Sequence, residues 1–298
     1  MLIYLNGAMV PKDEAKVSVF DHGFLYGDGV FEGIRVYGGR IFRLEEHVAR
    51  LYESARTLEL HVPMEQPEMV DAITRTVTVN ARPDAYVRVV VSRGPGDLGI
   101  DPGKCPKATV VIVVDTIAMY PKDAYDFGID LVTSSVRRVP MESLDPRVKS
   151  LNYLNNILAK LEAKNAGCLE AIMLNHHGAV AECTGDNLFI VKHGRLETPA
   201  VTQGALAGIT RGVVLEIALE LGIEARETEL ALHDVYNADE CFLTGTAAEI
   251  VPVVGVDGRT VGDGRPGALT RLIMAEFRRA CAAAPAPFQD RRAYAELP

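Results

Sequence analysis

The hydrophobic positions in the first part of the chain alternate over short runs, which is the pattern of half-buried strands. One pair of runs surrounds Asn6-Gly7, a dipeptide typical of hairpin turns, and a second pair, over residues 29–44, turns back at Gly38-Gly39. Valine-rich runs at 85–94 and 108–118 predict two more strands. From residue 44 to 59 the period becomes that of a helix, with apolar positions at Leu44, Val48, Leu51, Ala55 and Leu58.

A stretch at residues 119–127 that contains proline, aspartate and glycine predicts a linker between two β-rich parts of the chain. We therefore expect a small N-terminal α/β domain over 1–118 and a larger C-terminal domain over 128–298. The C-terminal part again alternates between strand and helix patterns. Its strands are predicted at 128–136, 169–174, 187–192, 239–244 and 249–256, and its helices at 152–167, 209–221 and 266–281.

The composition is that of an ordinary core-forming protein, with 48% apolar and 24% charged residues. The net charge of −9 argues against a nucleic-acid or membrane-surface partner, because both require a basic face. No apolar run approaches the ~20 residues of a membrane helix, and no secretion signal is evident. The five cysteines are scattered and form no C-x-x-C pair, so we expect a cytoplasmic protein without disulfides or a bound metal.

One lysine, Lys149, stands between a predicted strand and a predicted helix, in the segment VKSLNYLNN. Taken alone, it would be a surface lysine after a loop. Glu182 lies in an apolar strand and turn; it requires a cationic or N–H partner if it is buried, and is otherwise an exposed residue beside the turn.

Two further segments could bind an anion. Gly208-Ile209-Thr210 stand at the first turn of a predicted helix, where free N–H groups and a hydroxyl make an anion site, unless the threonine is a plain cap. Thr244-Gly245-Thr246 break an apolar strand and expose amides at its end, unless they form an ordinary turn.

The N-terminal part supplies cationic candidates. Arg50 lies on the helical segment. It is either exposed to solvent or binds a phosphate through its forked guanidinium. Tyr86 and Arg88 share a face of a predicted strand, where they would suit a carboxylate or simply form a polar sheet face. Pyridoxal phosphate is one interpretation among several. It would use the Lys149 amine, an anion site for its phosphate and the Glu182 carboxylate, while Tyr86 and Arg88 would bind a carboxylate.

Five segments of the chain are jointly very specific: YGDGVFEGIR, KSLNYLNN, GDNLFIVK, GITR and TGTAAEI. Through them the chain resembles, almost from end to end, the class IV (fold type IV) pyridoxal-phosphate aminotransferases, and most of all the branched-chain amino acid aminotransferases. The resemblance implies an α/β fold with a small α/β domain, a larger domain built on a β-barrel-like sheet, and the cofactor at their interface.

The resemblance also implies roles for individual residues. Lys149 is similar to the lysine that forms the imine with the cofactor and carries the proton, and Glu182 to the acid that faces the ring nitrogen. The implied cofactor-binding set is Arg50, Lys149, Tyr153, Glu182, Leu206, Gly208, Ile209, Thr210, Gly245 and Thr246. The implied substrate-binding set is Tyr26, Phe31, Tyr86, Arg88, Ile100, Thr246 and Ala247.

The activity implied by the resemblance is transamination between leucine, isoleucine or valine and 2-oxoglutarate. The loop GPGDLGID resembles one that crosses into the neighbouring subunit's site, so a homodimer is implied as the smallest active unit, with further assembly left open. Val89 stands where the branched-chain pattern often has proline, which leaves the breadth of substrates open.

Three alternatives remain. D-amino acid or (R)-amine transaminases share KSLN and GITR, but their pattern has an arginine and a histidine close together where this chain has SRGPGDLGID, which lacks a histidine. Aminodeoxychorismate lyases share the fold and cofactor but catalyse β-elimination. A cofactor-free binding protein on this scaffold would be colourless when purified.

Overall fold

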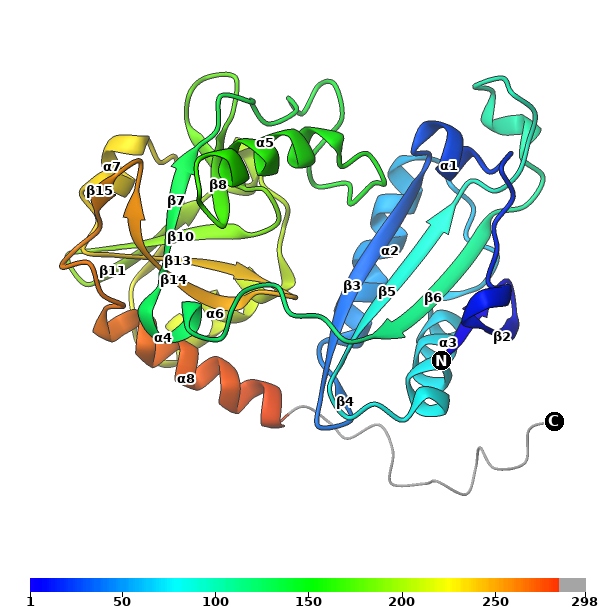
Figure 1. Cartoon of the computed structure of the whole chain (residues 1–298), viewed down its shortest axis with the longest axis horizontal. Coiled ribbons are helices and arrows are strands. Elements are labelled where there is room, and N and C mark those ends of the chain that lie inside the picture. Colours follow the sequence, from blue (N-terminus) through cyan, green and yellow to red (C-terminus); the bar gives the residue numbers. More distant parts are fainter. Residues whose placement is uncertain (284–298) are drawn as a thin grey trace. The chain divides into compact units, whose positions relative to one another are not determined.

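The computed structural model describes residues 1–283 and divides into two compact units (Figure 1). Of the described residues, unit 1 contains 1–117, Lys149–Leu151 and 279–283. Unit 2 contains residues 118–148 and 152–278. The grouping of Lys149–Leu151 with unit 1 was not expected from the sequence, and the domain limits at 118 and 128 stay predictions.

Unit 1 is built on a six-stranded antiparallel sheet in the order β2-β1-β6-β5-β3-β4. Both predicted hairpins are confirmed: β1 and β2 turn at Asn6-Gly7, where both residues have positive φ, and β3 and β4 turn at Gly38-Gly39. The strands are β1 Leu2–Leu5, β2 Ala8–Pro11, β3 Gly29–Tyr37, β4 Arg40–Ile41, β5 Ala85–Ser92 and β6 Thr109–Asp115.

Two helices, α2 (Leu44–Thr57) and α3 (Gln66–Asn80), pack together against one face of this sheet (Figure 1). The predicted stripe of α2 is confirmed, because Leu44, Val48, Leu51 and Ala55 are buried in the core with the valines of β5 and β6. Helix α3 was not predicted from the sequence, because its buried side includes Thr76 among apolar residues and threonine favours strands over helices. A short helix, α1 (His22–Tyr26), precedes β3.

Unit 2 contains a nine-stranded mixed sheet in the order β12-β11-β10-β13-β14-β7-β8-β9, with β15 paired to β14. The end strand β9 also lies against β10 and β11, so the sheet curls back on itself as a half-barrel. This confirms the β-barrel-like sheet. The strands are β7 Ile129–Thr133, β8 Glu170–Leu174, β9 Val180–Cys183, β10 Asn187–Lys192, β11 Arg195–Pro199, β12 Ala225–Thr228, β13 Glu240–Gly245, β14 Glu249–Val256 and β15 Arg259–Thr260.

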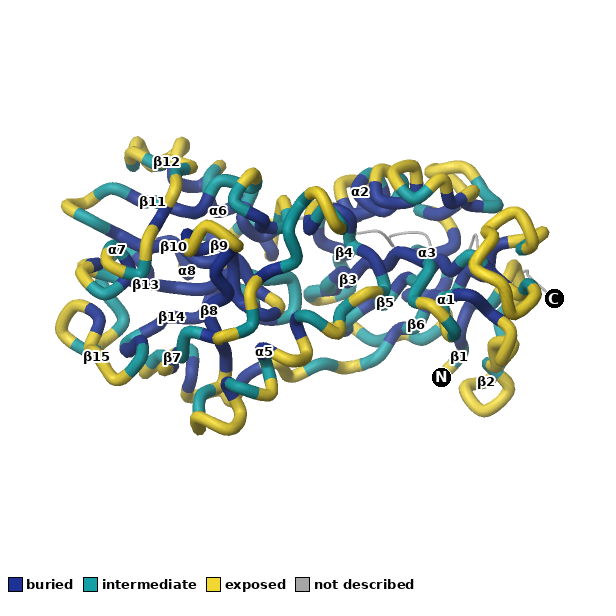
Figure 2. The backbone as a smooth tube through the Cα atoms, turned by 90° about the horizontal axis from the view of Figure 1, so that it is seen from above, coloured by how far each residue is buried: buried dark blue, intermediate teal, exposed yellow. Residues whose placement is uncertain are grey.

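Three long helices accompany this sheet: α5 (Leu154–Asn165), α6 (Ile209–Glu220) and α8 (Ala268–Ala283). Buried residues, dark blue in Figure 2, run along β8, β9 and β10 and much of β13 and β14. Strands β11 and β12 were not predicted from the sequence, because charged residues and proline break their alternation and β12 is a largely exposed edge. Shorter elements are η1 Lys12–Glu14, η2 Pro102–Lys104, α4 Ala124–Phe127, η3 Val201–Gln203 and α7 Leu232–Tyr236.

None of the helices in residues 1–283 is both long and apolar enough to cross a membrane. The five cysteines are all unpaired.

Candidate active site

Lys149 is anchored in unit 1 through its backbone. The N–H of Phe31 donates to the Lys149 carbonyl at 3.0 Å, and the N–H of Leu151 donates to the Gly29 carbonyl at 2.9 Å, so this short segment pairs with the first residues of β3. The Lys149 N–H in turn donates to Ser54 Oγ on α2, at 3.1 Å. The lysine is therefore not a freely placed surface residue.

The Lys149 amine lies over the aromatic ring of Phe31 on β3. Its Nζ is 4.6 Å from the centroid of the Phe31 ring, and the Arg88 guanidinium carbon is 4.5 Å from the same centroid. Such contacts between a cation and the face of a ring are attractive. Unit 1 thus brings two predicted cations, Lys149 and Arg88, to one predicted aromatic residue.

Tyr86 joins this group, because strand alternation places Tyr86 and Arg88 on one face, as predicted. The Arg88 guanidinium carbon is 5.4 Å from the Tyr86 ring centroid. The Tyr86 hydroxyl lies over Gly33, where an added Cβ would approach it to 1.9 Å. Gly33 therefore gives Tyr86 the space to lie across β3.

Two other predicted substrate residues lie near one loop. The Tyr26 hydroxyl, on α1, donates to the Leu98 carbonyl, which ties this helix to the loop over 94–101. Ile100, in the same loop, is 84% exposed. The expectation that this loop serves a neighbouring subunit stays a prediction.

Arg50 is buried, so the alternative of a solvated residue on α2 is wrong. Its guanidinium forms an ion pair with Glu32 of β3, with 2.7 Å between Nε and Oε1.

In unit 2, Glu182 is buried on β9, and the alternative of an exposed residue is wrong. Its Oε1 pairs with Arg138, with Nε at 3.0 Å and Nη2 at 2.9 Å. Its Oε2 accepts from the Leu206 N–H at 2.9 Å and from Asn187 Nδ2 at 3.2 Å. Both oxygens are held, so the orientation of the carboxylate is defined.

Arg138 is a residue of this site that the sequence analysis missed. It is buried, and its Nη1 also donates to Asn156 Oδ1, at 3.0 Å. Asn156, on α5, donates to the Thr184 carbonyl at 2.8 Å. The only signal in the sequence was a pair of arginines after a predicted strand, and nothing in the pair distinguishes Arg138 from its exposed neighbour Arg137.

The helix start that was predicted to bind an anion is confirmed as a helix start, and the anion stays a prediction. The helix begins at Ile209, with Gly208 as N-cap and no side chain capping the end, and Thr210 is buried in its first turn. A Cβ on Gly208 would come within 2.1 Å of Asn187 Oδ1, so only glycine fits. Asn187 also donates to the Leu206 carbonyl at 3.0 Å, which fixes Leu206 close to Glu182.

The remaining predicted residues lie at strand and helix ends. Gly245 ends β13, and Thr246 and Ala247 follow it in a half-buried loop. In the described chain, the hydroxyl of Thr244 beside them is buried without a hydrogen-bond partner. Tyr153 is half-buried and immediately precedes α5.

These residues fit a phosphorylated pyridine cofactor. An uncapped helix start with a buried threonine suits a dianionic phosphate. A buried carboxylate held on both oxygens suits a protonated ring nitrogen, and an anchored lysine amine suits covalent attachment. The fold and this donor set define an α/β enzyme that uses pyridoxal phosphate.

Comparison with known proteins agrees with this class. The family model for class IV amino-transferases matches residues 29–256. A protein of Methanocaldococcus jannaschii is 54% identical over 278 residues, which cover 93% of this chain and 96% of that protein. The chain belongs to the class IV aminotransferases, and it uses pyridoxal phosphate as cofactor.

Solved structures of two enzymes are also similar. The branched-chain amino acid aminotransferase of Escherichia coli has a TM-score of 0.92 and 37% identity, over 98% of this chain and 97% of that chain. The T.th. enzyme of the same name was solved with pyridoxamine 5'-phosphate (TM-score 0.91) and with N-(5'-phosphopyridoxyl)-L-glutamate (TM-score 0.89). Both of these complexes have 38% identity and cover 95% of each chain.

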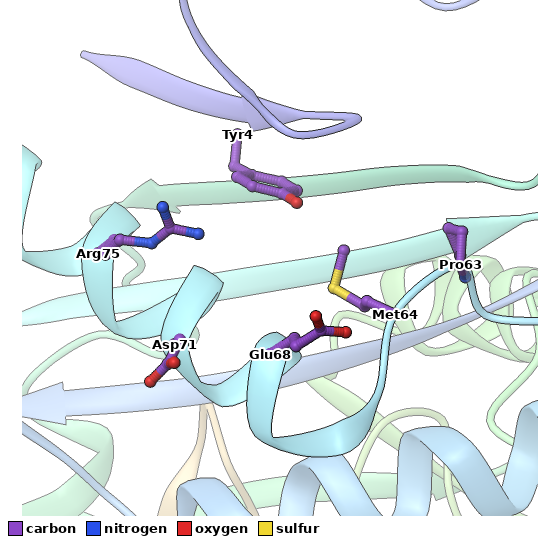
Figure 3. Close-up of a pocket in the computed structure, with 6 residues that line it drawn as sticks. All are labelled: Tyr4, Pro63, Met64, Glu68, Asp71 and Arg75. Atoms are coloured by element: carbon purple, nitrogen blue, oxygen red, sulfur yellow. The ribbon is translucent and has the colours of Figure 1, made fainter. Parts of the chain in front are cut away.

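A separate pocket in unit 1 is lined by none of the predicted site residues (Figure 3). It lies between β1 and α3 and combines two carboxylates with one guanidinium beside apolar side chains. Its lining residues are Tyr4, Pro63, Met64, Glu68, Asp71 and Arg75.

A buried acidic network lies next to Asn187 in unit 2. The Tyr120 hydroxyl donates to Asp186 Oδ2 at 2.7 Å, while Lys160 pairs with the fully buried Glu170 at 2.8 Å. Burial and the nearby Glu170 charge raise the pKa of Asp186 to about 7. Asp186 is therefore partly protonated near neutral pH.

This network predicts a pH-dependent stability difference for Asp186→Asn. The pKa of Asp186 rises from 3.8 in the unfolded chain to about 7 in the folded one, so the folded state binds more protons and wild-type stability falls as pH increases between these values. Asparagine does not titrate. We expect the variant to gain stability relative to wild type from pH 5 to pH 8, by roughly 2–3 kcal/mol.

Urea unfolding of both proteins at pH 5, 6.5 and 8 measures this difference. The exposed Asp126→Asn variant is the matched control and should follow wild type at each pH. A constant difference between Asp186→Asn and wild type across the range would show that Asp186 is ionised throughout.

Proposed function

We propose that the chain exchanges amino groups between branched-chain L-amino acids (leucine, isoleucine and valine) and 2-oxoglutarate. The observation that carries the proposal is the group formed by Phe31, Arg88 and Lys149, since it offers an apolar surface and a guanidinium beside one amine. The names of the similar E. coli and T.th. enzymes support it, as does the phosphopyridoxyl-L-glutamate complex of the latter.

The proposed cofactor contacts follow the family pattern. Lys149 would bind the cofactor covalently through its amine, and Glu182 would face the ring nitrogen. The phosphate would be held by Arg50, the start of α6 and Thr246. The other proposed contacts are Tyr153, Leu206, Gly208 and Gly245.

When bound, pyridoxal phosphate supplies the electron sink that accepts the electron pair left by the α-proton. The Lys149 amine would take that proton as a general base and return it as a general acid. Glu182 supplies the negative charge that holds a proton on the ring nitrogen. Arg138 keeps this carboxylate in place through a buried ion pair.

The pocket must accept an aliphatic side chain and a carboxylate in turn. Burying a carboxylate without a partner is costly, so the two substrates require both kinds of surface. Arg88 and Tyr86, with Tyr26, would meet the distal carboxylate of glutamate. Phe31 and Ile100 would provide apolar area. Thr246 and the Ala247 amide would hold the α-carboxylate.

We further propose that the chain works as a homodimer in the cytoplasm. Leu154, Ile157, Leu158 and Leu161 form an exposed apolar stripe on α5, at the spacing of one helix face. An exposed stripe of this kind is typical of a protein–protein contact. The five unpaired cysteines suit a reducing compartment.

The first prediction from the proposed function is that the cofactor attaches covalently to Lys149. The purified protein should be yellow, and borohydride reduction followed by digestion should leave the cofactor on the peptide that contains Lys149. Mass spectrometry identifies that peptide. Attachment to another lysine, or a colourless protein that takes up no cofactor, would remove the basis of the mechanism.

The second prediction concerns Glu182→Gln. The α-proton step should slow by orders of magnitude, because the amide cannot hold a proton on the ring nitrogen. Single-turnover absorbance measures this step, and cofactor titration should change much less. The variant should also lose stability, since Arg138 remains buried without its partner. A normal single-turnover rate would show that the ring nitrogen has a different partner.

The third prediction concerns Arg88→Leu. Loss of a charge-assisted contact of roughly 1.5–3 kcal/mol should lower the specificity for glutamate and 2-oxoglutarate about ten- to hundredfold. The half-reaction with leucine should change far less. The two half-reactions are followed separately by absorbance. Arg82→Leu, which removes an arginine that is paired with Asp115 and belongs to neither proposed binding set, is the control and should affect neither.

A panel of amino donors tests the substrate class directly. Leucine, isoleucine and valine should be the best donors to 2-oxoglutarate. Preference for D-alanine or (R)-1-phenylethylamine would identify a D-amino acid or (R)-amine transaminase instead. Equal losses for leucine and glutamate in Arg88→Leu would assign Arg88 to the α-carboxylate or to the fold.

A further inference from the structure

A glutamate lies inside the apolar core of unit 1. Strand alternation places Glu32 on the same face of β3 as Val30 and Ile34, and this is the face that α2 covers. Glu32 is only 1% exposed. A carboxylate in such a position is costly unless charged or hydrogen-bonding groups meet it.

Two side chains from α2 meet this carboxylate. Arg50 donates through Nε to Oε1 at 2.7 Å and through Nη2 to Oε2 at 2.9 Å. His47, three residues earlier and so on the same side of the helix, places Nδ1 2.7 Å from Oε2. Since a carboxylate only accepts hydrogen bonds, Nδ1 carries the proton.

The charges of the group are well defined. Burial by itself would raise the pKa of Glu32, but the Arg50 guanidinium and then His47 hold it well below its usual range. Burial lowers the pKa of His47, although the Glu32 carboxylate opposes this effect. The group is therefore an ionised Glu32 between a guanidinium and a neutral imidazole.

This arrangement determines the plane in which the Arg50 guanidinium lies. Glu32 takes two of its five N–H donors in a fork, which defines both the position and the tilt of the group. The same side of α2 carries Ser54, which holds the backbone of Lys149. One side of one helix thus positions both the proposed phosphate-binding arginine and the proposed cofactor lysine.

We propose that Glu32, supported by His47, is a positioning residue that orients the Arg50 guanidinium toward the cofactor phosphate. This inference rests on the proposed function, in which Arg50 belongs to the phosphate site. Glu32 itself would not touch the cofactor. Its effect would be selective for ligands that carry the phosphate.

The test compares two ligands that differ only in the phosphate. The apoenzyme is titrated with pyridoxal phosphate and with pyridoxal, and absorbance gives a Kd for each. The ratio of the two Kd values measures the contribution of the phosphate. In Glu32→Gln we expect pyridoxal phosphate to bind about tenfold more weakly or worse, while pyridoxal binds nearly as in wild type. General damage to the fold would weaken both ligands alike and would overturn the proposal.

Two further variants complete the comparison. Glu46→Gln is the matched control, because it removes an exposed ion pair with Arg43 on the same helix, and it should leave both Kd values unchanged. Arg50→Lys, which cannot form the fork, should lose the preference for the phosphate at least as strongly as Glu32→Gln.

The outcomes distinguish a failure of the positioning role of Glu32 from a failure of the phosphate site at Arg50. If Arg50→Lys loses the preference and Glu32→Gln keeps it, the positioning role is overturned while the phosphate site stands. If Arg50→Lys keeps it, Arg50 does not bind the phosphate and the positioning role is overturned as well. Transamination by the wild-type enzyme, measured with the donor panel, is independent of both results.

Substitutions at His47 test the proposal without altering a charge, should Glu32→Gln fail to fold. His47→Ala removes a donor to Glu32 and should weaken pyridoxal phosphate binding several-fold relative to pyridoxal. His47→Gln restores an N–H donor and should recover most of that loss. Identical ratios in His47→Ala and wild type would overturn the supporting role of His47 and, with it, the proposal as stated.

Discussion

The position of Lys149 depends on the backbone pairing of Lys149–Leu151 with the first residues of β3. Hydrogen bonds on both sides of this segment, from Phe31 and to Gly29, fix the main chain of the lysine against the sheet. The side chain keeps its own rotatable bonds and lies over the Phe31 ring. The proposed transfer of a proton between two carbon atoms requires this combination, because the backbone of the lysine must be fixed while its amine travels a short distance.

Each unit also buries one pair formed by a glutamate and an arginine: Glu32 with Arg50 in unit 1, and Glu182 with Arg138 in unit 2. Removing two charges from water costs about as much as their attraction returns, so such pairs are a poor source of stability. Their contribution here is orientation. In both cases further hydrogen bonds, from His47 or from the Leu206 amide and Asn187, hold the carboxylate in one position.

Three carboxylates are buried close together in the half-barrel of unit 2. Glu170, Glu182 and Asp186 are all buried on or beside neighbouring strands, and Lys160 and Arg138 pair with only two of them. The third carboxylate is Asp186, and burial and the Glu170 charge raise its pKa, which favours its protonated form. Its position directly before Asn187 connects this protonation to the residue that holds Glu182 and Leu206.

The sequence by itself determined the features that depend on neighbours along the chain. Alternation and turn residues predicted both hairpins of unit 1, and the helical period predicted α2. The spacing of Tyr86 and Arg88 predicted their common face, and the helix predicted over 209–221 is confirmed as α6. Most of the proposed site residues came from the family resemblance, because short motifs keep residue types at fixed spacings.

The tertiary structure alone decided which distant side chains meet. Arg137 and Arg138 are adjacent and chemically identical, but one is exposed and the other pairs with Glu182, 44 residues later. Alternation places Glu32 on the core face of β3 without indicating that Arg50 and His47 donate hydrogen bonds to it there. Local patterns in the sequence reflect the periodicity of one helix or strand. The partner of a buried charge is set by packing between such elements, and residue spacing along the chain does not encode this packing.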